Sequence, residues 1–351
     1  MRSARRIFLF LLLPPLAFVS AAGLVGGGEP FDSGPETEAV MPLGRGINMG
    51  NMLEAFPDEG AWGERVEKGY FALIAGRGFH TVRIPIRWSA HAMASAPYTI
   101  DERFFRRVEE VVGWALEQKL NVIINMHHYD EIFSEPDKHK ERFIAMWKQI
   151  AGRFKHLDPQ KVFFELLNEP HGRLTMDKWN GMIKETIAAI REIDRDHTII
   201  LSGTNWGGAS GLKGLKIPKG ETKVMATFHF YSPFNFTHQG AEWVNPSPPL
   251  GTKWPGVNLE AACKAIRDEL DIAKAWSEAH GKIPVFMGEF GAYSKADMQS
   301  RVNWTAYVRK QAELRGFSWA YWEFCAGFGV YDNDAKVWHE PLMEALGLGR
   351  K

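Results

Sequence analysis

Two glutamates follow apolar, strand-like runs of the chain. Glu169 lies in the segment FFELLNEPHG, directly after Asn168, and Glu289 lies in the segment FMGEFGA. Two carboxyl groups that face each other can act as acid and nucleophile when their surroundings push their pKa values apart. Cleavage of a glycosidic bond needs such a pair, because one group protonates the leaving oxygen while the other attacks the anomeric carbon. Glu169 and Glu289 are therefore the first candidates for chemistry.

Polar and aromatic side chains also stand at the ends of the other apolar runs. Packing alone hardly explains such groups at every run, so we interpret them as the lining of one site. Beyond the two glutamates, the candidates are Asn51, Glu54, Arg83, His127, His128, Asn168, Trp206, His229, Tyr231 and Trp322.

The runs that precede these residues alternate with amphipathic, helix-like stretches. The β-rich runs are Gly44–Met49, Thr81–Ile86, Asn121–His127, Lys161–Asn168, Thr198–Ser202, Lys223–Phe230, Ile283–Glu289 and Phe317–Glu323. Helical patterns lie near Glu64–Gly76, Glu102–Gln118, Lys138–Phe154, Met176–Ile193, Leu259–Ala279, Arg301–Arg315 and Glu340–Leu346. This alternation predicts an α/β protein, and eight strands are the number that closes a TIM barrel. We therefore expect a single (β/α)8 TIM barrel over residues 41–348, with its site at the carboxyl ends of the strands.

An open, doubly wound sheet is the structural alternative. Such a sheet normally carries a glycine-rich phosphate loop that opens a helix directly after its first strand. The glycines of residues 44–50 do not lead straight into a helix. The pattern therefore favours the barrel.

The N-terminus has the pattern of a secretory signal peptide, which we place at residues 1–21. Three arginines precede an apolar run from Ile7 to Val19, and small residues follow it. The run is too short for a comfortable membrane span. Residues 22–40, rich in glycine, proline and acidic groups, predict a disordered leader. We expect a secreted protein, extracellular or periplasmic, without stable membrane association after cleavage.

Charge and cysteine content narrow the partners. The 351 residues include 42 basic and 42 acidic side chains, and this balance gives no reason to expect nucleic acid or an anionic membrane as partner. Cys263 and Cys325 are the only cysteines. A large barrel does not need a disulfide bond for its stability, so we expect two free, mostly buried thiols. We also expect a monomer.

The motifs, taken together, resemble glycoside hydrolase family five, the cellulase family, from Leu43 to Leu346. The resemblance rests on FFELLNEPHG, FHFYSP, FMGEFGA and SWAYWEF, supported by GINMGNMLEA, VRIPIRW and INMHHYD. The chain is similar in particular to endoglucanases of thermophilic bacteria that also accept mannan. The resemblance implies a retaining endo-β-1,4-glucanase that needs no metal and no cofactor, with β-glucan, and glucomannan as a further candidate, as its polysaccharide substrate.

The resemblance also implies a role for each site residue. Glu169 is expected as the acid/base and Glu289 as the nucleophile, with Asn168 hydrogen-bonded to the sugar 2-hydroxyl. The supporting residues would be Arg83 and Tyr231 at the nucleophile, His229 at the acid/base, His127 and Trp322 at the cleaved sugar, and Asn51, Glu54 and His128 at sugar hydroxyls. The family commonly has Asp-Trp where this chain has His127 and His128, so which histidine does what stays open.

The expected contacts predict the order of the two pKa values. Arg83 and Tyr231 favour the anion of Glu289 and should lower its pKa, and the resulting charge should raise the pKa of Glu169. Glu165 shares strand parity with Glu169 and is expected to form a structural ion pair.

Several alternatives remain open at this point. Within the class, the chain could be an endo-β-1,4-mannanase or an enzyme of mixed preference, since glucose and mannose differ at the 2-hydroxyl. From another class, a non-catalytic glycan-binding barrel would lack either glutamate or Asn168, and none is missing. A zinc site built on the histidines lacks the ligand spacing of metal barrels. Trp206, Trp243 and Trp254 are either sugar platforms or packing residues.

Overall fold

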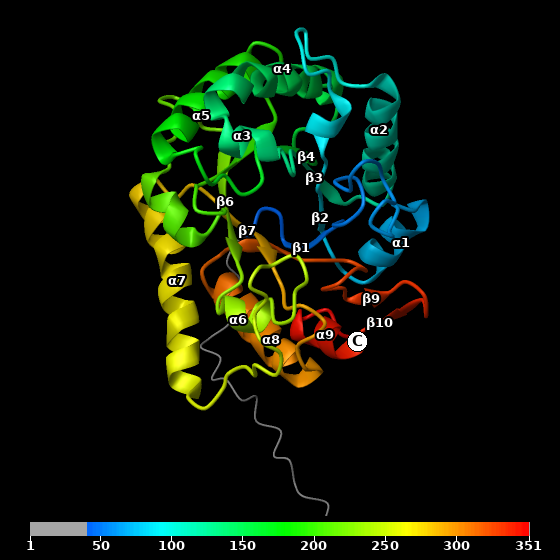
Figure 1. Ribbon diagram of the computed structural model, residues 1–351, viewed down its shortest axis with the longest axis vertical. Coiled ribbons are helices and arrows are strands. Elements are labelled where there is room, and N and C mark those ends of the chain that lie inside the picture. Colours follow the sequence, from blue (N-terminus) through cyan, green and yellow to red (C-terminus); the bar gives the residue numbers. More distant parts are fainter. Residues whose placement is uncertain (1–40, 351) are drawn as a thin grey trace, which may run out of the picture. The chain divides into compact units, whose positions relative to one another are not determined.

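The computed structural model describes residues 41–350, in which eight parallel strands close into a barrel (Figure 1). The strands are β1 (Arg45–Asn48), β2 (Thr81–Ile84), β3 (Asn121–Asn125), β4 (Val162–Glu165), β5 (Thr198–Ser202), β6 (Val224–Phe230), β7 (Val285–Phe290) and β8 (Ser318–Tyr321). Each strand pairs with the next one along the chain, and β8 returns to pair with β1. The predicted single (β/α)8 TIM barrel is confirmed.

Seven helices lie within a few residues of their predicted positions. They are α1 (Lys68–Gly76), α2 (Glu102–Glu117), α4 (Pro136–Phe154), α5 (Met176–Arg191), α7 (Leu259–Ala279), α8 (Met298–Leu314) and α9 (Glu340–Ala345). The sequence did not predict the short elements α3 (Asp130–Ser134), α6 (Phe234–Thr237), the 3₁₀ helices η1 (Trp88–His91) and η2 (Ala209–Gly214), and the hairpin of β9 (Tyr331–Asp332) and β10 (Val337–Trp338). They lie in the connections, where segments are too short to show a period.

Side-chain caps fix where three of the helices begin. Asp101 accepts hydrogen bonds from the backbone N–H groups of Arg103 and Phe104 at the start of α2. Asn258 caps α7 and Asp297 caps α8 in the same way. Each cap satisfies N–H groups that have no partner inside the helix, which typically contributes about 1 kcal/mol.

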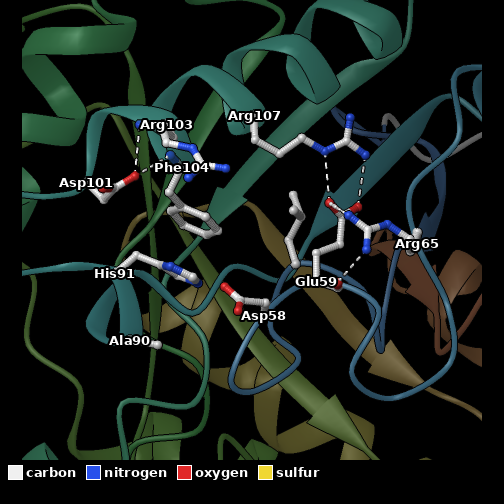
Figure 2. A pocket seen from close by; sticks show the side chains of 10 residues that line it. Asp58, Glu59, Arg65, Ala90, His91, Asp101, Arg103, Phe104 and Arg107 are labelled. Carbon is white, nitrogen blue, oxygen red and sulfur yellow. Dashed lines mark hydrogen bonds and ion pairs between the residues drawn. The ribbon is translucent and has the colours of Figure 1, made fainter.

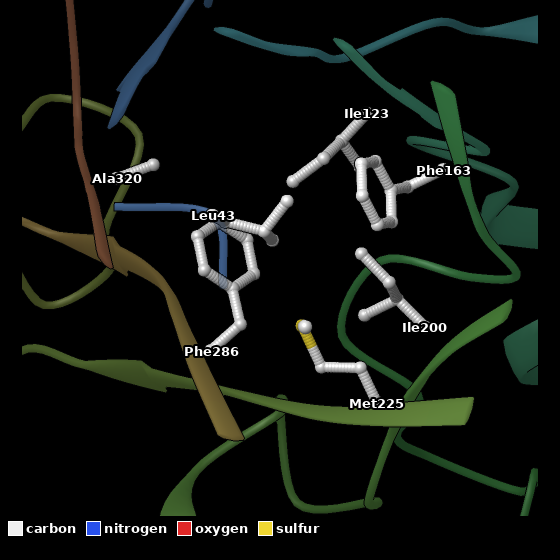
Figure 3. Packing of buried hydrophobic residues seen from close by; sticks show 7 residues of the cluster. All are labelled: Leu43, Ile123, Phe163, Ile200, Met225, Phe286 and Ala320. Atoms are coloured by element: carbon white, nitrogen blue, oxygen red, sulfur yellow. The ribbon is translucent and has the colours of Figure 1, made fainter. Parts of the chain in front are cut away.

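The barrel interior has an apolar layer on the side nearer the amino ends of the strands. It is formed by Leu43, Ile123, Phe163, Ile200, Met225, Phe286 and Ala320, and Figure 3 shows the larger side chains pointing toward one another, with Ala320 at the edge of the group. Side chains two residues apart on a strand point to the same face. The next inward positions are therefore Asn125 after Ile123 and Glu165 after Phe163, and both are buried. A polar layer thus rests on the apolar one, at the end where the site lies.

Cys263 and Cys325 are free and buried, as expected. Within residues 41–350, no helix is long and apolar enough to cross a membrane. The signal peptide predicted at residues 1–21 and the leader predicted at 22–40 lie outside the described residues.

Candidate active site

A cavity of about 610 Å³ opens at the carboxyl ends of the strands. Eight of the sequence-predicted residues line it, namely Asn51, His127, His128, Asn168, Glu169, Tyr231, Glu289 and Trp322. The sequence interpretation missed several loop side chains that also line it, namely Trp62, His238, Tyr293 and Phe328. Only Tyr293, three residues after β7, stood close enough to a strand end to be found from the sequence; the other three lie well inside their loops.

The two glutamates lie close together across the cavity. An oxygen of Glu169 and an oxygen of Glu289 are within 4.8 Å of each other. Retaining glycosidases hold their carboxyl groups about 5–5.5 Å apart, whereas inverting enzymes need about 6.5–9.5 Å to admit a water. The pair therefore has retaining geometry.

Arg83 forms an ion pair with Glu289, the nucleophile candidate. It is fully buried in β2, and its Nη1 donates to Glu289 Oε1 at 2.6 Å. Its Nη2 donates to Asn168 Oδ1 at 2.7 Å, and the Glu165 carboxylate binds the other edge of the guanidinium. The ion pair expected for Glu165 is therefore present, and its partner is the arginine of the site.

His229 and Tyr231 complete the surroundings of the two carboxylates. Tyr231 donates its hydroxyl to Glu289 Oε2 at 2.8 Å. His229 Nδ1 lies 2.7 Å from Glu169 Oε1 and 3.5 Å from Glu289 Oε2. Burial lowers the pKa of His229, but the charge of Glu289 and the hydrogen bond to Glu169 outweigh burial and raise it.

The predicted order of the glutamate pKa values is wrong for the free site. Burial raises the pKa of Glu169, but the hydrogen bond and charge of His229 outweigh it, so this pKa is lowered. Burial raises the pKa of Glu289, and the negative charge of Glu169 raises it further. Together they outweigh the lowering effects of His229, Arg83 and Tyr231, so the pKa of Glu289 is raised. The sequence reasoning counted the cation beside Glu289 but neither the burial of both groups nor the histidine on Glu169.

Trp322 forms a flat wall beside His127. The two rings are parallel within 8°, with centroids 5.8 Å apart. Behind the indole lies Gly50, where an added Cβ would sit 2.8 Å from the Trp322 ring. His127 is buried, and its Nδ1 lies 3.1 Å from Asn125 Oδ1. Residue 50 therefore has to be glycine for the Trp322 ring to lie in this position.

Left-handed backbone conformations gather around the cavity. Glu169 has φ of 49°, His128 of 51° and Asn51 of 66°. Non-glycine residues adopt this region only where surrounding contacts impose it, at about 1–3 kcal/mol each. The fold thus holds three of the cavity's side chains in directions that a relaxed strand or loop would not give them.

Glu54 does not line the cavity, contrary to the sequence interpretation. It is fully buried and accepts hydrogen bonds from the backbone N–H groups of Asn51 and Met52. Glu323, which the sequence analysis did not select, accepts from the N–H groups of Ala326 and Phe328 and from the Asn51 side chain. Burial raises the pKa of Glu54 to about 8 and that of Glu323 to about 7. These acids shape the loops that carry lining residues.

The three tryptophans with open interpretations differ in exposure. Trp206 is 58% exposed and stacks on His171 with an interplanar angle of 11°, outside the residues that line the cavity. Trp243 is 60% exposed and lines the cavity beside Tyr293. Trp254 is 3% exposed and belongs to the packing. Only the first two present a surface to solvent.

A second cavity, of about 1000 Å³, lies between the β1–α1 loop and the start of α2 (Figure 2). Three acids line it, namely Asp58, Glu59 and Asp101, and two of them are engaged. Glu59 binds the guanidinium of Arg107 through two hydrogen bonds of 2.9 Å, and Asp101 caps α2. The candidate pair Glu169 and Glu289 lines the smaller cavity, so we place the chemistry there.

Glu169, His229 and Glu289 also form the one cluster in residues 41–350 whose atoms could geometrically hold a metal ion. Two of the three groups already share a hydrogen bond, and Arg83 places a positive charge on the third. A cation there would meet that charge directly. The cluster is better described as a hydrogen-bonded carboxylate pair.

An eight-stranded barrel with such a pair at the ends of β4 and β7 defines a glycoside hydrolase with retaining geometry. The family model described as cellulase, glycosyl hydrolase family 5, matches residues 43–327. The chain therefore belongs to glycosyl hydrolase family 5, and the resemblance drawn from its motifs is confirmed.

Named relatives agree with this family. Endoglucanase H of Acetivibrio thermocellus is 36% identical over 303 residues, which cover 86% of this chain and 32% of that protein. This chain thus spans about a third of that curated relative. The endoglucanase Cel5A of the hyperthermophilic Thermotoga maritima is 52% identical, with a TM-score of 0.83 over 87% of this chain and 97% of that one. Cellulose synthase subunit Z of Clostridioides difficile is 36% identical, with a TM-score of 0.82 over 87% and 99%.

Proposed function

We propose that this protein is a retaining endo-β-1,4-glucanase that cleaves internal bonds of cellulose or β-glucan. The observation that carries the proposal is the carboxylate pair within 4.8 Å, with Arg83 and Tyr231 on Glu289 and His229 on Glu169. This arrangement gives the two glutamates different partners, and double displacement requires them to act differently.

Glu289 is the proposed nucleophile and Glu169 the proposed acid/base. A Glu289 oxygen forms a bond to the anomeric carbon while the glycosidic C–O bond breaks, and the leaving oxygen receives a proton from Glu169. Glu169 then takes a proton from water, whose oxygen attacks the same carbon and releases Glu289. Two inversions give net retention.

We propose that His229 and Glu169 hold the catalytic proton together. Their 2.7 Å contact can carry it as histidinium with carboxylate or as histidine with carboxylic acid. The raised pKa of His229 and the lowered pKa of Glu169 describe the first form, in the free site. A leaving oxygen beside Glu169 draws the proton through that carboxyl group, so the acid role survives the low pKa of Glu169.

The proposed substrate contacts follow the cavity lining. Trp322 would form the apolar floor under the sugar that is cleaved, and the Asn168 amide would meet its 2-hydroxyl. His127, His128 and Asn51 would meet further hydroxyls. Trp206 would stack on a sugar beyond the cavity, because its exposed ring has a free face.

Mannan activity is the second candidate, and one observation favours it. A Thermotoga maritima Cel5A structure 51% identical to this chain is described in complex with mannotriose. Initial rates on carboxymethyl-cellulose, barley β-glucan, glucomannan and mannan, measured side by side, test both candidates. NMR of the first-formed anomer tests retention. Absence of turnover on all four polymers would leave the non-catalytic glycan-binding barrel.

We further propose that the protein is exported and acts as a monomer. The basic and apolar pattern of residues 1–21 supports export. Cell fractionation with mass spectrometry of the mature N-terminus tests it, and sedimentation tests the oligomeric state. An intact N-terminus in the cytoplasmic fraction would contradict export.

A further inference from the structure

We propose that Glu165, the last residue of β4, is a positioning residue of this active site. It acts through Arg83 and Asn125, which orient the groups that meet the substrate. The inference rests on the proposed function, because it concerns how the same site is held. Glu165 itself is 1% exposed and does not line the cavity.

Every N–H group of Arg83 has one acceptor. Nε donates to Glu165 Oε2 at 2.7 Å, and the two protons of Nη2 go to Glu165 Oε1 and Asn168 Oδ1, both at 2.7 Å. The two protons of Nη1 go to Glu289 Oε1 at 2.6 Å and Asn48 Oδ1 at 2.9 Å. A guanidinium offers five donors in one plane. Here none is left over, so its plane has a single setting.

Glu165 determines that setting because it holds one whole edge of the plane. With Nε and Nη2 fixed on the carboxylate, Nη1 has to point at Glu289. The second proton of Nη2 is directed at Asn168 Oδ1, so the Asn168 Nδ2 group is left for the cavity that Asn168 lines. Glu165 thereby sets both the contact of the nucleophile and the donor offered to the sugar.

A second arm runs from Glu165 to His127. Asn125 Nδ2 donates to Glu165 Oε1 at 2.9 Å, which leaves Asn125 Oδ1 facing His127 Nδ1 at 3.1 Å. Burial lowers the pKa of His127 well below its usual value, so its ring is neutral. The proton then sits on Nδ1, and Nε2 is an acceptor. One buried carboxylate thus fixes a donor on Asn168 and an acceptor on His127.

Glu165 also shares the positive charge of Arg83 with the nucleophile. The charged and titratable groups that face Glu289 are Arg83 from β2, His229 from β6, Tyr231 after β6 and Glu169 after β4. Glu165 binds the same guanidinium as Glu289, and its negative charge repels the negative charge of Glu289. Without that charge, Arg83 would act on Glu289 alone and lower its pKa.

The sharpest variant is Glu165→Gln, which keeps the shape and removes the charge. Three donors face the carboxylate, two from Arg83 and one from Asn125. An amide has one oxygen, so at least one of these donors would meet an N–H group. The matched control is Glu221→Gln, because Glu221 forms a similar two-point contact with Arg191, at 2.8 and 3.3 Å, away from the cavity.

For Glu165→Gln we expect kcat/KM on an aryl cellobioside to fall about 100-fold. Its acid limb should move to lower pH, by about one unit or more, because a negative charge that raises the pKa of Glu289 is removed. Glu221→Gln should lower the melting temperature alone. Glu165→Asp, which keeps the charge but shortens the reach, should lose at least tenfold in kcat with the acid limb in place. An acid limb that stays in place in Glu165→Gln would overturn the proposal, and so would a rate loss no larger than in the control. So would full kcat in Glu165→Asp.

A measurement without substrate separates this inference from the proposed function. Carbon-13 NMR titration of the glutamate carboxyl groups should show the Glu289 resonance titrating at lower pH in Glu165→Gln than in the wild type. If the wild type cleaves no β-glucan, the proposed function fails while the titration still decides the role of Glu165. An unchanged Glu289 titration would overturn that role whatever the activity.

Discussion

Gly50→Ala should damage the active site while leaving the fold nearly intact. The added Cβ would lie 2.8 and 2.9 Å from two atoms of the Trp322 indole. Carbon atoms pack at about 3.5–4.0 Å, so the ring has to retreat by roughly 0.7 Å or more. The backbone of Gly50 is not in the left-handed region, so the contact is the whole cost. Because the ring is only half-buried, it can move into the cavity, where it would take space from the sugar.

The expected sizes follow from that displacement. A shift approaching 1 Å at a substrate-positioning group can cost about 100-fold in kcat/KM, whereas overpacking with an open side should cost about 1 kcal/mol of unfolding free energy. Kinetics on aryl cellobioside and thermal unfolding measure the two. Gly181→Ala in α5 is the control, because nothing lies within 4 Å of its Cβ, and it should be slightly more stable with unchanged rates. Wild-type kcat/KM in Gly50→Ala would refute the idea that this glycine seats Trp322.

Three further outcomes are expected. Glu289→Ala should lose many powers of ten in turnover, and added azide should yield only the inverted glycosyl azide, detected by NMR. Glu169→Ala should still cleave activated aryl glycosides. The reverse pattern would exchange the two roles. Arg83→Met should move the acid limb of kcat/KM to higher pH, because Arg83 lowers the pKa of Glu289, and an unmoved limb would make Arg83 purely structural. His229→Asn should move the basic limb to lower pH, since His229, with its raised pKa, keeps a proton beside Glu169 until the pH rises through that pKa; an unchanged basic limb would exclude the shared proton.

The strand positions could be predicted from the sequence because eight apolar runs carry the pattern themselves. Glu169, Glu289 and Arg83 lie on those runs or within four residues of their ends. For Arg83 and Glu289, which lie on strands, the position in the strand determines where the side chain points, whereas Glu169 follows β4 by four residues and has a left-handed backbone. The barrel rule then brings the strand ends together, so the convergence of these residues was predictable before any coordinate was known.

Prediction failed where the chain had left the strand. Glu54 stands six residues beyond β1, and backbone N–H groups of its own loop turned its carboxylate inward. The pKa order failed for a related reason. Arg83 and His229 were both expected beside the glutamates, but the sequence reasoning left out the effect of His229 on the pKa of Glu169 and the burial of both carboxyl groups. Loop direction and burial depend on contacts that no local pattern contains.

The second carboxylate on Arg83 accounts for how the barrel can hold a nucleophile that changes charge. A buried cation that loses its only partner costs about 3–5 kcal/mol. In the proposed glycosyl-enzyme, Glu289 becomes a neutral ester, so Arg83 loses that counter-charge in the middle of the reaction. Glu165 still binds Nε and Nη2 in that state. The intermediate therefore does not leave an unpaired cation in the core, and the polar layer serves the folded state and each step of the double displacement with the same contacts.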